Sequence, residues 1–136
     1  VDFNVLKKWE SENVLRYLGF TNNIKKYLMK THCLILPTFY NEGTPKVILE
    51  ASALKVPVIT TNIKGCKNAV QDNVTGFLCK TKDHYDLYLK IEKFIRLTNE
   101  EKIKMGKKAR VKMEKYYDEN IVIKKYMNKI NEIISL

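Results

Sequence analysis

Four short apolar segments alternate with helical patterns in the first part of the chain, and this alternation limits the possible folds more than any other feature. The apolar segments are Val14–Phe20, Leu34–Thr38, Val56–Thr61 and Gly76–Cys79. The helical patterns between them are Asn23–Lys30, Pro45–Lys55 and Lys67–Gln71. Because strands that are apolar throughout suit a sheet buried on both faces, the pattern predicts parallel strands between helices. The predicted fold class is α/β, with a partial doubly wound, Rossmann-like parallel sheet.

From Asp83 onward the sequence predicts only helices, each preceded by a residue that caps helices well. Asp83 precedes the first of them and Asp118 the third. Thr98 and Glu101 have the spacing of a capping box at the start of the second. Apolar side chains at helical spacing predict core-facing stripes. The stripes consist of Leu87, Ile91, Phe94 and Ile95 in the first helix, and of Ile123, Met127, Ile130 and Ile134 in the third. We therefore predict one domain over residues 1–136, with a helical tail over about 83–136.

The chain is strongly basic, with 25 Lys and Arg against 15 Asp and Glu and a formal net charge of +10. This charge favours an anionic partner but does not choose among nucleic acid, an anionic membrane and a phosphorylated substrate. A basic nucleic-acid-binding module is one alternative, although no recognised binding motif supports it. The most basic run, Lys102–Lys115, is interleaved with Ile103, Ala109 and Met113, so we interpret it as a solvated helix face.

Cysteine usage and hydropathy indicate the environment. Cys33, Cys66 and Cys79 form no C-x-x-C pair, which argues against a disulfide framework and against a zinc ribbon. A reducing cytoplasm fits this pattern best. No apolar run approaches the roughly 20 residues that span a bilayer. No residues have metal-ligand spacing, so neither a metal nor another cofactor is predicted.

The loop after the Leu34–Thr38 segment is the first candidate for a ligand site. In an open α/β sheet, ligands bind beyond the carboxyl ends of the strands, which is where Glu42 and Gly43 fall. Because Gly43 has no Cβ, a ligand can approach the backbone closely there, as phosphate-binding turns require.

The helix that follows this loop offers donors for an anion. Thr44 is predicted to be its N-cap and Pro45 its first residue. The free N–H groups of Lys46 and Val47 would then point back toward the loop and form an anion seat.

Two charged residues of this helix have both a functional and a structural interpretation. Lys46 lies at the positive end of the helix dipole, where a bound anion would offset the unfavourable placement of a cation. Alternatively, Lys46 simply pairs with Glu50 one turn on. Glu50 lies beside the predicted buried stripe and, when ionised, only accepts hydrogen bonds, which suits a diol such as ribose. The alternative for Glu50 is an ordinary exposed helical glutamate.

Residues Glu42–Glu50 read E-G-T-P-K-V-I-L-E, which resembles the E-x7-E signature of the retaining GT-B glycosyltransferases of family 4, the group 1 glycosyltransferases. The similarity extends over nearly the whole chain. It includes L-G at Leu18–Gly19, L-P at Leu36–Pro37, A-S-A-L at Ala51–Leu54, P-V-I-T-T at Pro57–Thr61 and G-F-L at Gly76–Leu78. The resemblance implies the C-terminal, nucleotide-sugar-binding half of a GT-B fold, followed by C-terminal helices.

The resemblance also implies roles for single residues. Glu50 would bind the ribose hydroxyls, and Glu42 would be the catalytic residue at the transferred sugar. The residues that would hold the donor sugar and the diphosphate are Gly43, Thr44, Lys46 and Val47. The loop after the first apolar segment would line the base.

That base-binding loop comprises Phe20, Thr21 and Asn22. An N-cap for the following helix is an equally good interpretation of Thr21 or Asn22. The family usually has an acidic residue shortly after the glycine that corresponds to Gly65, whereas this chain has Lys67 and Asn68 there. This departure puts a site role for the Gly65 loop in doubt.

The resemblance implies a reaction and a set of partners. The reaction would be transfer of a hexosyl or N-acetylhexosaminyl group from a UDP-sugar to a glycan or lipid-linked acceptor, with retention of configuration and without a metal. The chain would be an N-terminally truncated fragment, inactive alone, that lacks the acceptor-binding N-terminal domain. It would work in the cytoplasm, with peripheral contact to an anionic membrane and without nucleic acid. A non-catalytic scaffold that keeps the fold is the remaining alternative.

Overall fold

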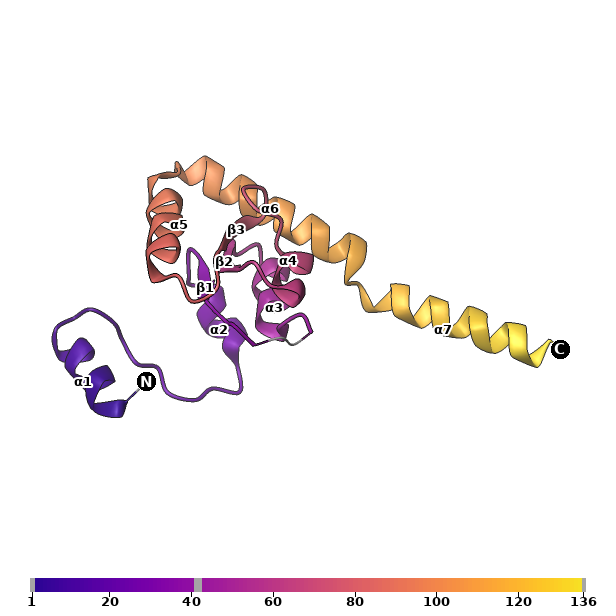
Figure 1. The fold of residues 1–136 in the computed structure, drawn as a ribbon. Helices are drawn as coiled ribbons and strands as arrows, with labels where there is room; N and C mark the ends of the chain where they lie inside the picture. Colours follow the sequence, from indigo (N-terminus) through magenta and orange to yellow (C-terminus); the bar gives the residue numbers. More distant parts are fainter. Residues whose placement is uncertain (1, 41–42, 136) are drawn as a thin grey trace.

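The computed structural model describes residues 2–40 and 43–135. Its centre is a parallel sheet with the strand order β1 (Leu34–Leu36), β2 (Val58–Thr61), β3 (Gly76–Cys79) (Figure 1). In the register of the sheet, Ile59 of β2 lies opposite Ile35 of β1 and Phe77 of β3. The predicted parallel sheet is confirmed for the last three of the four apolar segments.

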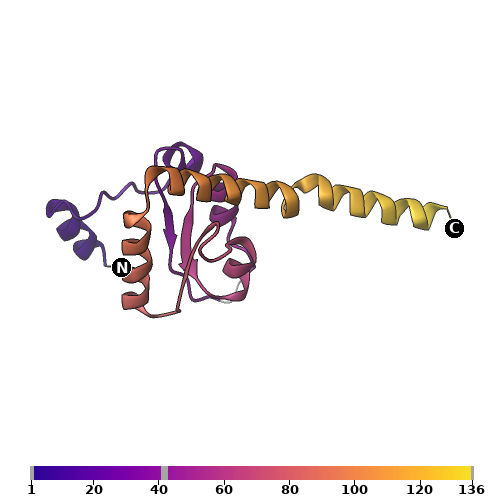
Figure 2. The same ribbon diagram turned by 90° about the horizontal axis from the view of Figure 1, so that it is seen from above.

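Helices connect the strands and continue beyond them. They are α1 (Phe3–Ser11), α2 (Ile24–Leu28), α3 (Lys46–Ala53), α4 (Lys64–Ala69), α5 (His84–Arg96), α6 (Asn99–Tyr116) and α7 (Glu119–Ile134). Figure 2 shows α5 on one side of the strands and α3 and α4 on the other, so the centre of the sheet is covered on both faces, whereas Ile35 of β1 is 43% exposed. This is the layered α/β arrangement that the apolar strands predict.

The central strand β2 is buried on both faces because successive strand residues point to opposite sides of the sheet. Val58 belongs to a core cluster with Ile48 of α3 and Cys66 of α4. Its neighbour Ile59 belongs to a second cluster that includes Phe94 of α5. The two clusters explain why β2 is apolar without alternation.

Helix α6 touches both core clusters and rests closely on the end of α3. Met105 is part of the cluster around Ile59, and Met113 is part of the cluster around Val58. A Cβ atom built on Gly106 would lie 2.0 Å from the carbonyl oxygen of Lys55, the second residue after α3. Only glycine permits this approach of the two backbones without a shift.

Two buried threonine hydroxyls hold the end of β1 against β2. Thr60 Oγ1 donates to the carbonyl oxygen of Leu36 over 2.8 Å, and Thr61 Oγ1 donates to the carbonyl oxygen of Thr38. Both threonines are at most 1% exposed. The Leu36 carbonyl also accepts from the Thr38 N–H over 2.9 Å. The two hydroxyls satisfy their own buried hydrogen-bonding groups in this way, and they attach the start of the loop after β1 to β2.

The predicted helix starts in the tail are confirmed. Asp83 accepts from the Asp86 N–H, and Asp118 accepts from the Asn120 N–H. Thr98 and Glu101 form both hydrogen bonds of the capping box. These caps need only residues within one turn, which is why the sequence predicts them well.

The predicted core-facing stripes of the tail are only partly correct. In α5, Phe94 is buried and both Leu87 and Ile91 pack against its cluster, whereas Ile95 is 66% exposed. In α6, Ile103 is exposed, and the buried positions are Met105, Gly106, Ala109 and Met113.

The stripe predicted for α7 faces outward instead of a core. Ile123, Met127, Ile130 and Ile134 are all between 45% and 77% exposed, and α7 has no buried residue. The reason is geometric: α7 continues from the end of α6 and projects away from the sheet (Figures 1 and 2). No helix in the described residues is long and apolar enough to cross a membrane.

The strand predicted for Val14–Phe20 is wrong. The segment makes no ladder with another strand in the described part of the chain, and Phe20 is 91% exposed. It associates with α1 instead: the Tyr17 N–H donates to Glu10 Oε1 over 3.1 Å, and the Tyr17 ring lies edge-on to Phe3. An apolar segment becomes a strand only where a neighbouring strand offers backbone partners.

Helix α4 begins earlier than its pattern predicts, at Lys64 rather than Lys67, and ends at Ala69 rather than Gln71. Its small and apolar residues set this position, because Gly65, Cys66 and Ala69 are the ones that are buried. The Gln71 N–H donates to Thr75 Oγ1 over 2.8 Å and so belongs to the loop before β3.

We predict that Gly106→Ala destabilises the chain, although alanine normally stabilises a helix interior by about 1 kcal/mol relative to glycine. The new methyl group would clash with the Lys55 carbonyl, and relieving such overpacking costs about 1–3 kcal/mol. Urea unfolding measures the change. Lys107→Ala, at the exposed next position, should change the free energy of unfolding by less than about 0.5 kcal/mol. A more stable Gly106→Ala variant would disprove the close contact between α6 and α3.

Candidate functional site

The carboxyl ends of the three strands border a cavity of about 300 Å³. Pro37 follows β1, Thr61 ends β2 and Cys79 ends β3, so each strand contributes to its rim. The remaining lining residues are Phe39, Lys80, Lys82, Asp83, His84 and Leu87. The cavity therefore lies where open α/β sheets bind their ligands.

An aromatic pair lies at this edge, and its binding potential was not predicted from the sequence. The rings of Phe39 and Tyr40 stack with centroids 4.6 Å apart, and Lys82 Nζ lies 5.2 Å from the Phe39 centroid. Both rings are more than half exposed. Exposed aromatic faces beside a cation suit stacking against a base or a sugar ring.

The Cys33 and Cys79 thiols are poor nucleophiles at neutral pH. Burial raises the pKa of the Cys33 thiol to about 12, because the thiolate would lose its hydration. Burial, followed by the nearby Asp86 carboxylate, also raises the pKa of Cys79. Among residues 2–40 and 43–135, no three His, Cys, Asp or Glu side chains are grouped so that they could hold a metal ion.

The loop between β1 and α3 positions the residues predicted to hold the donor. Glu42, the predicted catalytic residue, lies outside the described residues. Gly43 is exposed, and a Cβ atom built on it would meet no heavy atom within 4 Å. Thr44 is half-buried directly before the helix. The open space at Gly43 leaves room for a ligand beside the backbone.

Helix α3 begins one residue later than predicted. Pro45, with φ −59° and ψ 127°, takes the N-cap position, and Lys46 is the first helical residue. Thr44 is therefore not the N-cap, and no side chain in the described residues caps the helix. Because the first N–H groups of a helix have no partner within it, those of Lys46 and Val47 are donors at the end of the loop.

Lys46 and Glu50 form an ion pair, which is the structural alternative that the sequence allows for Lys46. Lys46 Nζ lies 3.6 Å from Glu50 Oε1, and the two side chains are 88% and 34% exposed. An exposed pair at this spacing contributes only about 0.2–0.5 kcal/mol. The contact is therefore weak enough for either group to exchange it for a ligand.

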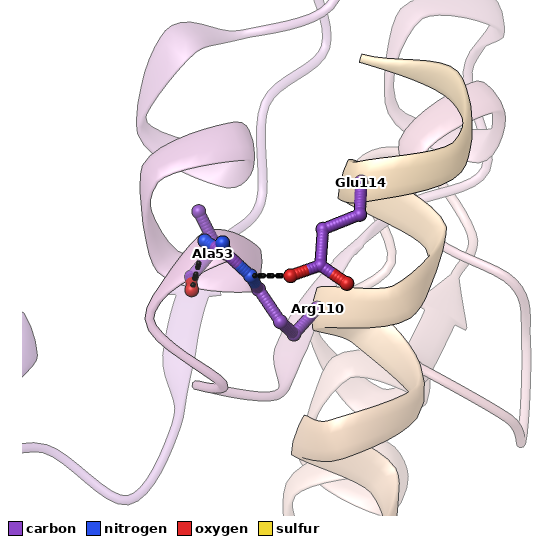
Figure 3. A network of polar contacts seen from close by, with 3 residues as sticks. All are labelled: Ala53, Arg110 and Glu114. Atoms are coloured by element: carbon purple, nitrogen blue, oxygen red, sulfur yellow. Dashed lines mark hydrogen bonds and ion pairs between the residues drawn. The ribbon is translucent and has the colours of Figure 1, made fainter. Parts of the chain in front are cut away.

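Glu50 also lines a cavity of about 320 Å³ with two cationic residues, Lys25 of α2 and Arg110 of α6. Ala53 and Leu54 at the end of α3 complete its lining. Arg110 Nη1 donates to the Ala53 carbonyl oxygen over 3.0 Å, and its Nε donates to Glu114 Oε1 over 2.7 Å (Figure 3). Lys25 and Arg110 were not predicted. The only signal for Arg110 was its place next to the buried Ala109 in a basic run interpreted as solvated.

The predicted base-binding residues precede α2 and β1 in the sequence, and the hydrogen bond that Thr21 forms is to a residue of the same loop. Phe20 is almost fully exposed and has no strand around it. Thr21 Oγ1 accepts from the Asn23 N–H over 3.0 Å, and Asn23, rather than Thr21 or Asn22, is the N-cap of α2. Their role at a base stays a prediction.

With this geometry established, comparison with known proteins identifies the family. The model of the family "Glycosyl transferases group 1" matches residues 4–112. This chain belongs to the group 1 glycosyltransferases. The group 1 family expected from the E-x7-E resemblance is therefore confirmed, and its match includes the β1–α3 loop and the strands β1, β2 and β3.

Two curated relatives of this group 1 chain are bacterial transferases. It is 29% identical over 125 residues to the N,N'-diacetylbacillosaminyl-diphospho-undecaprenol alpha-1,3-N-acetylgalactosaminyltransferase of Campylobacter jejuni, which covers 91% of the chain and 32% of that enzyme. It is 34% identical over 107 residues to the capsular polysaccharide biosynthesis glycosyltransferase CapM of Staphylococcus aureus. This match covers 77% of the chain and 25% of CapM. The chain thus spans a third or less of the length of these relatives.

A solved structure shares the fold. The complex of HepE from Anabaena with UDP and glucose superposes with a TM-score of 0.82 over 95% of this chain and 35% of HepE, at 19% sequence identity. At this identity the similarity establishes the fold alone. It confirms the α/β class of the group 1 chain, with a parallel sheet followed by C-terminal helices.

Arg110 connects α6 to α3 through its hydrogen bond to the Ala53 carbonyl oxygen. We predict that Arg110→Gln lowers the free energy of unfolding by about 1 kcal/mol, because this partly buried, charge-assisted hydrogen bond is lost. Urea unfolding measures this. Arg96→Gln is a matched control, since Arg96 makes the same kind of 2.7 Å pair one turn back, with Glu92, and its side chain is 76% exposed. The control should lose less than about 0.5 kcal/mol. Equal losses would show that the Ala53 contact contributes nothing.

Proposed function

We propose that this chain is the donor-binding part of a glycosyltransferase that transfers a sugar from a UDP-sugar to a glycan or lipid-linked acceptor. The observation that carries the proposal is the placement of the E-x7-E segment: its described residues, Gly43–Glu50, run from the loop after β1 into α3 in a chain that matches the group 1 family over residues 4–112. The related Campylobacter enzyme is named as an N-acetylgalactosaminyltransferase that acts on a diphospho-undecaprenol. HepE was crystallised with UDP and glucose.

The start of α3 is suited to the diphosphate of such a donor. The N–H groups of Lys46 and Val47 face the loop, and a helix N-terminus adds a partial positive charge there. Gly43 lets the phosphates approach the backbone, and Thr44 supplies a hydroxyl beside them. The exposed Lys46 ammonium would leave Glu50 to neutralise the diphosphate.

Glu50 is suited to the ribose of the nucleotide. Its carboxylate is one-third exposed on α3 and offers only acceptors, which a pair of neighbouring hydroxyls can donate to. The cationic Lys25 and Arg110 line the same cavity. The base would lie toward Phe20, Thr21 and Asn22.

The reaction we propose proceeds with retention of configuration. The bond between the sugar C1 and the β-phosphate oxygen breaks, and a bond from C1 to the acceptor oxygen forms on the same face. The acceptor proton passes to the departing diphosphate, so UDP leaves as the only other product. Helix N–H groups that stabilise the charge on the leaving diphosphate would lower the barrier, and Glu42 would act at the transferred sugar.

The acceptor would bind to a further, N-terminal domain, as in full-length members of the resembled family. We propose that this domain and the present chain together form the complete enzyme, that the chain alone is inactive, and that the enzyme works in the cytoplasm beside the membrane that holds a lipid-linked acceptor. The transferred group would be a hexosyl or an N-acetylhexosaminyl group.

We predict that Glu50→Gln weakens UDP binding by the chain about tenfold, because the ribose hydroxyls lose a charged acceptor. Isothermal titration calorimetry measures the affinity. With 2′-deoxy-UDP the unaltered chain should also bind more weakly, and Glu50→Gln should then add little, since the interacting partner is already gone.

Glu92→Gln is the matched control, because Glu92 also forms a helical i,i+4 ion pair and its side chain is 35% exposed. It should leave the UDP affinity unchanged. The proposed role of Glu50 is refuted if UDP binds Glu50→Gln as tightly as the unaltered chain.

A further inference from the structure

A cavity of about 680 Å³ lies away from the carboxyl edge of the sheet, between α6 and the segment that precedes β3. β3 begins at Gly76, so Val74 and Thr75 place this cavity at the amino end of the strand. It is lined by Asn68, Gln71, Val74, Thr75, Lys108, Val111, Lys112, Lys115, Tyr116 and Tyr117. None of these residues has a role in the proposed donor site.

Three lysines of α6 face this cavity together. Lys108, Lys112 and Lys115 follow one another at spacings of four and three residues, which puts them on one side of the helix. The lining contains no acidic residue, and none of the three forms an ion pair within the described chain. Like charges at this spacing repel one another, so an anion in the cavity would relieve an unfavourable arrangement.

The acidic residues next to the lining have other partners. Glu114 accepts from Arg110 Nε over 2.7 Å. Asp72 accepts from the Leu78 N–H and from Asn73 Nδ2. The lysines therefore remain available to an external anion.

The rest of the lining suits an anion that carries an organic part. Lys112 is half-buried, and burial lowers its pKa because the ammonium loses hydration that an anion would replace. The Lys115 ammonium lies 5.2 Å from the Tyr116 ring centroid, at the rim. Val74, Val111 and Tyr117 add apolar surface to the cavity.

The spacing of the lysines selects the class of anion. Lys108 and Lys115 are seven residues apart, so their backbones are separated by about 10 Å along the helix axis. One carboxylate is too small to contact all three ammonium groups across that span, whereas a diphosphate or phosphodiester presents several oxygens. Lysine also binds phosphate well as a point charge.

We propose that this cavity binds a phosphate-bearing ligand through Lys108, Lys112 and Lys115, independently of the donor site. The phosphate has two possible sources, a soluble diphosphate and an anionic lipid headgroup. This proposal goes beyond the proposed function, because it does not depend on UDP or on Glu50.

Two probes distinguish the sources. Inorganic diphosphate is titrated into the chain by calorimetry at constant ionic strength. Co-sedimentation compares vesicles of phosphatidylglycerol and phosphatidylcholine in equal amounts with vesicles of phosphatidylcholine alone. The triple substitution Lys108→Gln, Lys112→Gln, Lys115→Gln should weaken binding of the active probe at least about tenfold, the effect of losing one charge-assisted contact. Binding of diphosphate alone identifies a soluble ligand, and binding of the anionic vesicles alone identifies a lipid.

A charge-matched control separates a built site from general basicity. The triple substitution Lys7→Gln, Lys8→Gln, Lys90→Gln also removes three positive charges, but at positions outside this cavity. It should leave binding of the probe unchanged within about twofold. Equal losses in the two triple variants overturn the proposal, and so does failure of the unaltered chain to bind either probe. Because the start of α3 is also proposed to bind diphosphate, the expected result is loss of one binding event from the titration. Diphosphate binding whose affinity and stoichiometry are both unchanged by the Lys108, Lys112 and Lys115 substitutions also overturns the proposal.

Thermal unfolding shows whether the first triple variant is folded. If it is not, Lys108→Gln, Lys115→Gln keeps the half-buried Lys112 and should reduce binding in the same direction. Unchanged binding in that double variant then counts against the proposal.

Discussion

The rest of the structure depends on complete burial of β2 between two core clusters. Every residue of this strand is buried, so its polar groups must find partners inside the protein. Thr60 and Thr61 meet this requirement by donating to the carbonyl oxygens of Leu36 and Thr38. The same two bonds fix the end of β1, and with it the point where the loop toward α3 begins. A requirement of the core thus determines the geometry of the candidate site.

Helix α6 fixes the C-terminal end of α3. Its Gly106 lets it approach the backbone after α3, and its Arg110 donates to the last carbonyl of α3 at Ala53. Glu50 lies on the short helix between these constraints, in a cavity to which Arg110 also contributes. The position of α3 relative to the sheet is therefore set at both ends, as a site that orients a ligand requires.

The sequence predicts best those features whose causes are local. The caps at Asp83, Thr98 and Asp118 depend on one helical turn, and the mostly buried strands β2 and β3 follow from continuous apolar runs. Features that need distant partners escape prediction. Val14–Phe20 has the composition of a strand but no neighbouring strand, and the stripe of α7 has no described surface to cover.

The site follows the same rule. The E-x7-E segment between β1 and β2 could be located from sequence, because a short pattern between two strands carries that information. Arg110 could not, since its partner Ala53 is 57 residues away and only the packing of α6 on α3 brings the two together. The stacking of Phe39 on Tyr40 beside Lys82 likewise depends on how two loops meet at the sheet edge.

A crystal structure of the chain with UDP tests the central claim most directly. The account predicts diphosphate oxygens within hydrogen-bonding distance of the Lys46 and Val47 N–H groups, and ribose hydroxyls that donate to the Glu50 carboxylate. A nucleotide bound elsewhere, with the start of α3 unoccupied and Glu50 still paired only with Lys46, would contradict it.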